Sequence, residues 1–126
     1  MDESITWVDD PLKVYLSLVR EIPPLEKSEE SDCIDHVRAA DDMADAARKR
    51  LIEGNLHLVI SLAQHYRHGK IHMLDLLEQG NAGLLLAVQS LKEHIPPSFS
   101  EYAVPFIERA LAEAKISLPI SPAHKR

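Results

Sequence analysis

The sequence lacks the features that mark secreted and membrane proteins. Its 126 residues contain one cysteine, Cys33, which excludes a disulfide within the chain. The longest candidate apolar run, residues 82–88, falls well short of the roughly 20 residues that a membrane-spanning helix needs. The first ten residues are acidic, whereas a signal peptide begins with basic residues and continues with apolar ones. These absences predict a cytoplasmic protein with no membrane partner.

Basic charge is also scarce. The chain has 14 lysines and arginines against 20 aspartates and glutamates, which gives a net charge of −6. Residues 1–50 carry 13 acids and 7 bases, while residues 51–126 carry 7 of each, so the acidic surplus lies in the N-terminal part. Tight binding of nucleic acid needs a basic surface, because contacts with phosphates supply most of the affinity. The composition therefore argues against an independent, tight DNA- or RNA-binding protein.

What the sequence does contain is helical periodicity. Apolar residues recur at steps of three and four, without strand-like alternation or an internal repeat. We expect an all-α fold: a single compact bundle of about five helices over residues 9–115, between tails at residues 1–8 and 116–126. The first predicted helix begins at Asp10-Pro11 and ends before Pro23-Pro24, and the second begins at Ser28 and reaches the Asp41-Asp42 pair, which either interrupts it or caps the next. The third has an apolar stripe from Ile52 to Tyr66, and the fourth runs from Met73 to Leu91. The fifth runs from a capping box at Ser98–Glu101 to Lys115.

The fourth predicted helix breaks local rules in its middle. Gly80, Asn81 and Gly83 each weaken a helix by up to about 1 kcal/mol relative to alanine. Glycines at these positions allow another backbone to come close, either a helix of the same domain or a partner. The three leucines at 84–86 cannot all face one core, so Leu85 or Leu86 either meets another helix or forms part of a partner surface.

Other candidate sites are weaker. His65, His68 and His72 could suggest a metal, but a glycine ends the helix before the last of them and no acid or cysteine stands nearby, so exposed histidines are favoured. Trp7 is interpreted as a local staple of the first helix, and Cys33 as an inert thiol. The sequence has no nucleophile elbow, phosphate loop or paired acids. We therefore expect no enzyme activity, no metal and no cofactor.

Four separated blocks carry a resemblance to a known family. They are Asp10-Pro11 with Tyr15-Leu16, then Leu-Ile-Glu-x-Asn-Leu-x-Leu-Val at 51–59, Asp-Leu-Leu-x-x-Gly-Asn-x-Gly-Leu at 75–84, and Phe-Ser-x-Tyr-Ala at 99–103. In this order and spacing, over about residues 9–111, they resemble the N-terminal core of bacterial sigma factors of the sigma-seventy type. Those subunits bring RNA polymerase to promoters. The resemblance implies a region 2-like helical domain, a role in transcription initiation, and core RNA polymerase as the partner.

The resemblance also implies a polymerase-binding helix. In that family the segment that matches residues 75–84 docks on the clamp coiled coil of the largest polymerase subunit. One departure is that the family usually has Gln followed by Glu where this chain has Glu78 followed by Gln79, which turns the carboxylate by about 100° around the helix. The polymerase contacts that the resemblance implies are Asp75, Glu78, Gln79 and Asn81. Leu85 is added to them as the leucine expected to lie on a partner surface.

The segment that reads promoter DNA departs further. Aromatic residues there hold flipped bases of the melted promoter, and the implied DNA contacts are Phe99, Tyr102, Phe106 and Arg109, although helical spacing makes the aromatic residues core candidates first. The usual Thr and Arg of the family are Glu101 and Glu108 here, and the usual two tryptophans are Pro105 and Phe106. A proline inside a helix lacks the N–H group, so we expect this helix to kink or to start late. Contact with the −10-type promoter element is expected to be weakened.

Two functions follow from these residues. The first is a sigma-factor-like transcription initiation protein that binds core RNA polymerase and touches promoter DNA only weakly or within the polymerase complex. The alternative is a protein-interaction module without DNA recognition, a sigma decoy or regulator that binds an anti-sigma factor or another partner. A third possibility is a folded fragment of a longer sigma factor.

Overall fold

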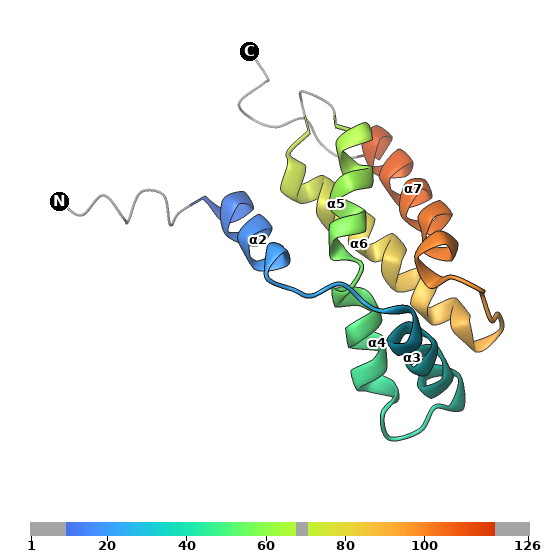
Figure 1. Cartoon of the computed structure of the whole chain (residues 1–126). Helices are drawn as coiled ribbons and strands as arrows, with labels where there is room; N and C mark the ends of the chain where they lie inside the picture. The colour runs from blue at the N-terminus through green and yellow to red at the C-terminus, as the bar shows by residue number, and fades with distance from the viewer. Residues whose placement is uncertain (1–9, 68–70, 118–126) are drawn as a thin grey trace, which may run out of the picture.

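The computed structural model describes residues 10–67 and 71–117, with side chains up to residue 114 (Figure 1). These residues form helices and no strand, which confirms the all-α class. Trp7, His68 and the tail at residues 1–8, together with residues 118–126 of the other tail, lie outside the described residues. The helices are α2 (Pro11–Arg20), α3 (Lys27–Ala39), α4 (Ala44–Glu53), α5 (Leu56–His65), α6 (Met73–Gln89), the short 3-10 helix η1 (Ser90–Lys92) and α7 (Phe99–Ser117).

Helices α2 and α7 begin with the caps that the sequence predicts. At the start of α2, Oδ1 of Asp10 accepts hydrogen bonds from the backbone N–H groups of Leu12 and Lys13 at 3.2 and 3.3 Å. Pro11 occupies the first turn, where a missing N–H costs nothing. At the start of α7, Oγ of Ser98 accepts from the N–H of Glu101 at 3.4 Å. Both caps satisfy donors that a helix leaves without partners.

The Asp41-Asp42 pair interrupts the helix rather than capping the next one. Helix α3 ends at Ala39, and Ala40 takes the left-handed conformation with φ of 53°. Asp41 then closes the turn, since its Oδ1 accepts from the N–H of Met43 at 2.9 Å and its Oδ2 lies 2.7 Å from Nδ1 of His36. This contact raises the pKa of His36 and lowers that of Asp41, because each charge stabilises the other.

The apolar stripe from Ile52 to Tyr66 does not belong to one continuous helix, contrary to our expectation. It is divided between the end of α4 and the whole of α5, and the break falls at Gly54 and Asn55. A Cβ on Gly54 would lie 3.0 Å from Cβ of Leu25, so the linker before α3 passes close to this point. The buried Asn55 donates from Nδ2 to the carbonyl of Leu51 at 2.7 Å and satisfies a carbonyl near the end of α4.

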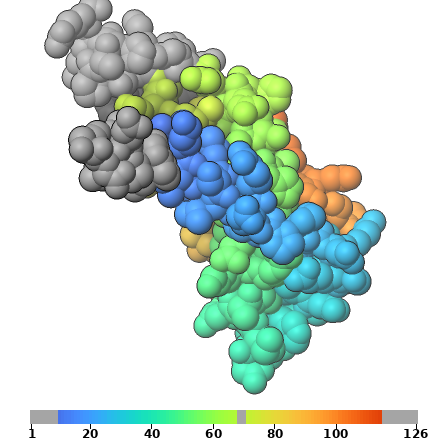
Figure 2. Space-filling view, turned by 60° about the vertical axis from the view of Figure 1, so that its left-hand side comes forward, coloured from blue at the N-terminus to red at the C-terminus, as the bar shows by residue number. Residues whose placement is uncertain are grey.

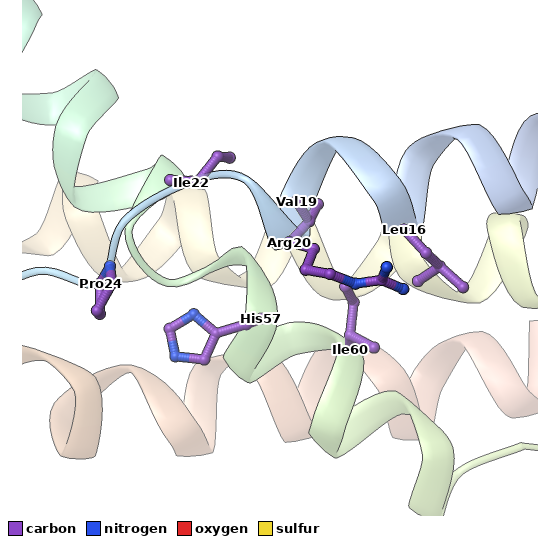
Figure 3. Close-up of a pocket in the computed structure, with 7 residues that line it drawn as sticks. All are labelled: Leu16, Val19, Arg20, Ile22, Pro24, His57 and Ile60. Atoms are coloured by element: carbon purple, nitrogen blue, oxygen red, sulfur yellow. The ribbon is translucent and has the colours of Figure 1, made fainter.

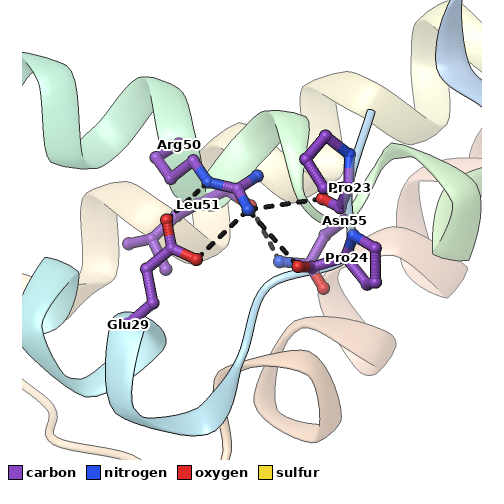
Figure 4. A network of polar contacts seen from close by, with 6 residues as sticks. All are labelled: Pro23, Pro24, Glu29, Arg50, Leu51 and Asn55. Carbon is purple, nitrogen blue, oxygen red and sulfur yellow. Dashed lines mark hydrogen bonds and ion pairs between the residues drawn. The ribbon is translucent and has the colours of Figure 1, made fainter. Parts of the chain in front are cut away.

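The linker between α2 and α3 is fixed by Arg50 of α4 (Figure 4). Its guanidinium forms a two-pronged ion pair with Glu29, with Nε 2.7 Å from Oε2 and Nη2 3.2 Å from Oε1. Nη2 also donates to the carbonyls of Pro23 and Pro24 at 3.3 and 3.4 Å. The hydrogen bond from Arg50 holds the pKa of Glu29 below its usual value. One side chain therefore joins the start of α3 and the linker from α2 to α4.

The core lies around α6, which contacts α2, α4, α5 and α7 (Figure 1). Gly80 and Gly83 make these contacts close. A Cβ on Gly80 would lie 2.7 Å from Cγ1 of Val59 in α5, and one on Gly83 would lie 2.5 Å from the carbonyl oxygen of Phe106 in α7. The two glycines thus serve packing within the domain. The largest fully buried side chains are Phe99, Leu51, Leu76, Leu77, Leu84, Leu91, Ile107, Leu111, Val59 and Val88.

Helix α7 starts at Phe99 and continues through Pro105, so it does not start late. Pro105 lies in the second turn and deprives the carbonyl of Glu101 of its usual helical donor. The surrounding packing holds the helix despite this loss, because Ala103, Ile107 and Leu111 are fully buried on its inner side. No helix in the described ranges is long and apolar enough to cross a membrane.

Candidate functional site

An exposed stripe runs along the side of α6 opposite the glycines. Asp75 and Glu78 are exposed in its first half, and Leu85 and Leu86, which are 42% and 56% exposed, lie in its second half. Helical geometry of about 100° per residue aligns these positions with the exposed Ala82 and Gln89. We call Asp75, Glu78, Ala82, Leu85, Leu86 and Gln89 the α6 stripe. It is acidic at the N-terminal end of the helix and apolar toward the C-terminal end.

The stripe contains three of the five residues that the sequence nominates for a partner: Asp75, Glu78 and Leu85. The other two, Gln79 and Asn81, are half-buried. They lie on opposite edges of the stripe, because positions i and i+2 of a helix are separated by about 200° around its axis. A partner that lies along the stripe would face the first three directly and would reach the other two at its margins.

Asn81 is turned toward α2. Its Nδ2 donates a hydrogen bond to the hydroxyl of Tyr15 at 3.1 Å. Its other amide atom, Oδ1, is buried and has no hydrogen-bond partner among the described residues. An unpaired buried carbonyl is unusual and costly. The pairing with Tyr15 was not predicted, because the two residues stand in separate sequence blocks and no local pattern links them.

A hollow of about 450 Å³ adjoins the second half of the stripe. Leu85 forms part of its wall together with two cations, Arg48 of α4 and Lys92 of η1. Arg48 also pairs with Asp45 one turn earlier in its own helix. Both cations come from elements other than α6, so sequence reasoning missed them. The hollow gives the apolar end of the stripe a basic border.

The predicted DNA contacts on α7 do not all reach the surface. Phe99 is 0% exposed, belongs to the core, and donates its backbone N–H to Oε2 of Glu30 at 3.0 Å. Its nomination as a DNA contact is therefore corrected: the ring is enclosed by the bundle and has no free face for a base. The helical stripe that contains it also explains the error, because core and stacking aromatic residues share the same spacing.

Tyr102, Phe106 and Arg109 share one side of α7. Tyr102 and Phe106 are half-buried, and their ring centres lie 5.2 Å apart. The hydroxyl of Tyr102 is hydrogen-bonded to Oγ of Ser90. The side chain of Arg109 is 85% exposed, with Nε 3.9 Å from a carboxylate oxygen of Glu113. The two aromatic rings are therefore engaged inside the domain, and Arg109 is the outermost of the three.

Two carboxylates lie next to the side of α7 that carries Tyr102 and Arg109. Glu101 is exposed and Glu108 is half-buried. They are seven residues apart and so share one face, about 100° around the helix from Tyr102 and Arg109. Glu101 also lines a hollow of about 430 Å³ with His94 and Tyr102. A nucleic-acid phosphate at this border would meet negative charge.

The histidines do not form a metal site in the part of the chain that the structure describes. No group of three His, Cys, Asp or Glu side chains gathers there. His68, the middle residue of the candidate set, falls outside that part. Cys33 is buried, and burial raises the pKa of its thiol, which makes a reactive thiolate unfavourable.

Comparisons with known proteins give a consistent result. The chain is 35% identical over 116 residues to the RNA polymerase sigma factor SigA of Lactococcus lactis subsp. cremoris, 36% identical over 107 residues to SigA of Clostridium acetobutylicum, and 37% identical over 109 residues to the RNA polymerase sigma factor RpoS of Coxiella burnetii. These alignments cover 85 to 90% of the chain but only 28 to 32% of the relatives. No protein-family model matches the chain.

Proposed function

The chain carries a region of the sigma-seventy type, and we propose that it binds core RNA polymerase through the α6 stripe. The polymerase surface would be the clamp coiled coil of the largest subunit, which the family resemblance implies. The observation that carries the proposal is the division of α6 into two sides. One side is packed tightly through Gly80 and Gly83, while Asp75, Glu78 and Leu85 on the other face solvent.

The chemistry of the stripe supports a protein partner. Exposed leucines supply apolar area, and carboxylates at its other end select a partner with basic groups, since opposite charges favour the correct register. Neither Asp75 nor Glu78 forms an ion pair within residues 10–67 and 71–114, so both are available. The proposed role is non-enzymatic, needs no cofactor, and is exercised in the cytoplasm, where the polymerase acts.

Promoter contact is proposed to be weak outside the polymerase complex. Phe99 is enclosed in the core, the hydroxyl of Tyr102 is bonded to Ser90, and Glu101 adds negative charge beside them. Of the nominated DNA contacts, Arg109 is the most exposed to an approaching phosphate.

Capture by purified core RNA polymerase at low salt tests the main proposal. Asp75→Ala and Leu85→Ser should each reduce capture several-fold, and Asn81→Ala should reduce it less, because Asn81 lies at the edge of the stripe. Asp35→Ala, at an exposed position of α3, and Ile95→Ser, at an exposed apolar position, serve as matched controls. Absence of capture of the unaltered chain would reject the proposal.

The second candidate function, a sigma decoy or regulator that binds an anti-sigma factor or another protein, is favoured by the acidic border of α7 formed by Glu101 and Glu108. Fluorescence anisotropy with single-stranded promoter-element DNA separates the two functions. Sequence-selective binding that Tyr102→Ala abolishes would rule out a pure decoy. Capture by core polymerase without any DNA response, in the isolated chain and in the complex, would favour it.

A further inference from the structure

Helix α2 carries a second exposed surface, formed by residues other than those nominated on α6 and α7. Val14 and Leu18 are 40% and 63% exposed, and they lie one turn apart in a single row. Beside them Lys13, Ser17 and Arg20 form a parallel polar row. These five residues, which we call the α2 face, line a hollow of about 490 Å³. Large apolar side chains in one exposed row are typical of an interaction surface.

The α2 face is also a basic surface on an acidic protein. Lys13 and Arg20 are the charged residues of α2, and the helix contains no acid. Because α2 contributes +2 to a total of −6, the rest of the chain carries −8. Neither cation forms an ion pair with a described residue. Two cations that form no ion pair within the described ranges therefore border the exposed apolar row.

A second hollow lies on the other side of Arg20, between α2 and α5 (Figure 3). It measures about 480 Å³ and has an apolar lining with His57 at its rim. Figure 3 shows the guanidinium of Arg20 between the two helices. Arg20 thus lines both hollows. The hollow between α2 and α5 therefore lies next to the α2 face and could accept a bulky apolar side chain of a partner. The apolar residues of this lining are Leu16, Val19, Ile22, Pro24 and Ile60.

We propose that the α2 face binds an amphipathic α-helix of a partner protein, with acidic residues beside its apolar row. Apolar side chains of the partner would pack on Val14 and Leu18, and carboxylates would meet Lys13 and Arg20. Since α2 is ten residues long, or about 15 Å, two to three turns of the partner cover it. This surface goes beyond the proposed function, because it uses none of the residues of the α6 stripe.

The charge distribution favours a short acidic helix over an extended polyanion. Duplex DNA or an anionic membrane would face the acidic remainder of the chain as well as α2. A short helix lies over Lys13 and Arg20 and passes the capping acids Asp10 and Glu21 only at the two ends of α2, while exposed charges farther than about 8–10 Å are screened at ordinary salt. Phosphates also offer no apolar area to Val14 and Leu18. Figure 2 shows α2 at the surface of the molecule, in blue.

A designed peptide tests the proposal on the full chain. The probe is a fluorescein-labelled helical peptide of about four turns, with leucines in one row and glutamates on both sides of it. Fluorescence anisotropy at low salt should show saturable binding, and a scrambled peptide of the same composition should bind at least tenfold more weakly. Leu18→Ser and Arg20→Glu should each weaken binding of the designed peptide about tenfold.

Matched variants keep the result interpretable. Ile95→Ser removes an apolar residue of similar exposure, and Lys49→Glu reverses an exposed cation of α4; both should leave the affinity within about twofold. Circular dichroism should show that all four variants retain the fold, since the altered side chains are exposed. Equal losses from Leu18→Ser and Ile95→Ser, or equal binding of the scrambled peptide, would overturn the proposal.

Other occupants give different signals. A stronger response to a single-stranded oligonucleotide or to phosphatidylglycerol vesicles, lost in Arg20→Glu, would reject a protein helix in favour of phosphate. Trp7 is the single tryptophan of the sequence. A shift of its fluorescence maximum in Leu18→Ser without peptide would show that the chain's own N-terminal segment occupies the face, which also overturns the proposal.

Discussion

Asn81 of α6 donates a hydrogen bond from Nδ2 to the hydroxyl of Tyr15 of α2 at 3.1 Å, although the two residues are 66 positions apart in the sequence. The opposite atom of the same amide, Oδ1, is buried without a partner in the part of the chain that the structure describes. This half-satisfied amide is the polar link between α2 and the edge of the α6 stripe.

Tyr15→Phe should therefore lower the free energy of unfolding by about 1 kcal/mol, because it leaves both ends of the Asn81 amide without partners. Urea denaturation provides the measurement. Tyr66→Phe is the matched control: Tyr66 is also half-buried, and no side-chain hydrogen bond joins it to a described residue. A similar loss in both variants would contradict a specific role of the Tyr15 hydroxyl.

Gly83→Ala should destabilise the protein by roughly 1–3 kcal/mol even though alanine favours helices, since overpacking outweighs propensity. The new Cβ would lie 2.5 Å from the backbone oxygen of Phe106, which cannot move alone. Gly80→Ala should cost less, because its Cβ would meet side-chain atoms of Val59 and Leu111 at 2.7 and 3.1 Å and none of the backbone atoms that oppose a Cβ on Gly83. Thermal unfolding of both variants tests the order, and a larger loss at Gly80 would be inconsistent with it.

The His36–Asp41 contact predicts a pH dependence. The pKa of His36 is raised in the folded protein, so its contribution is complete below the ordinary histidine pKa and disappears as the pH rises through the folded value. The pKa of Asp41 is lowered, so its contribution is present above the ordinary aspartate pKa and disappears as the pH falls through the folded value. The contact should be strongest between about pH 4 and 6.5.

NMR titration of the His36 ring measures this effect. Asp41→Asn should return the pKa of His36 toward its ordinary value, because the amide cannot supply the negative charge. Asp35→Asn, which removes an acid on the same helix, should change it much less, since Asp35 is only a lesser electrostatic influence. Equal shifts in the two variants would assign the raised pKa to the general acidity of α3.

Arg50→Lys should lower stability by about 1 kcal/mol, because an ammonium cannot reproduce the two-pronged pair with Glu29 and also reach the carbonyls of Pro23 and Pro24. Unfolding in urea is the suitable measurement, because guanidinium chloride is a salt and would screen the ion pair. Lys49→Arg, next to it in α4 and exposed, is the control. No change in Arg50→Lys would mean that the pair contributes nothing measurable.

Features that depend on residues close in sequence, such as helix caps, were predicted correctly from local sequence patterns. Asp10 and Ser98 cap their helices as expected, because a capping side chain acts within three residues of its own position. The break at Gly54 was missed, and the close approach of Leu25 to Gly54 could not be predicted from a local pattern, because the two residues are distant in sequence. Phe99 was nominated for DNA from the family resemblance, whereas its helical spacing favoured the core position that the structure shows.

The candidate site was predictable to a similar extent. Asp75 of the α6 stripe was nominated from the sequence block at 75–84, and Leu85 from the run of leucines that follows it; both are exposed. The cations beside Leu85 and the hydroxyl beside Asn81 come from other helices. Such neighbours are set by tertiary packing, which a single sequence does not display.

The attachment of α2 has a further consequence for binding. Arg50 anchors the linker at Pro23 and Pro24, so α2 would remain tethered next to α6 even when the bond between Tyr15 and Asn81 opens. A short tether corresponds to an effective concentration in the millimolar range. Any ligand that binds Asn81 therefore competes with the tethered Tyr15 hydroxyl of α2. Its apparent affinity falls as the fraction of molecules with Tyr15 bound to Asn81 rises.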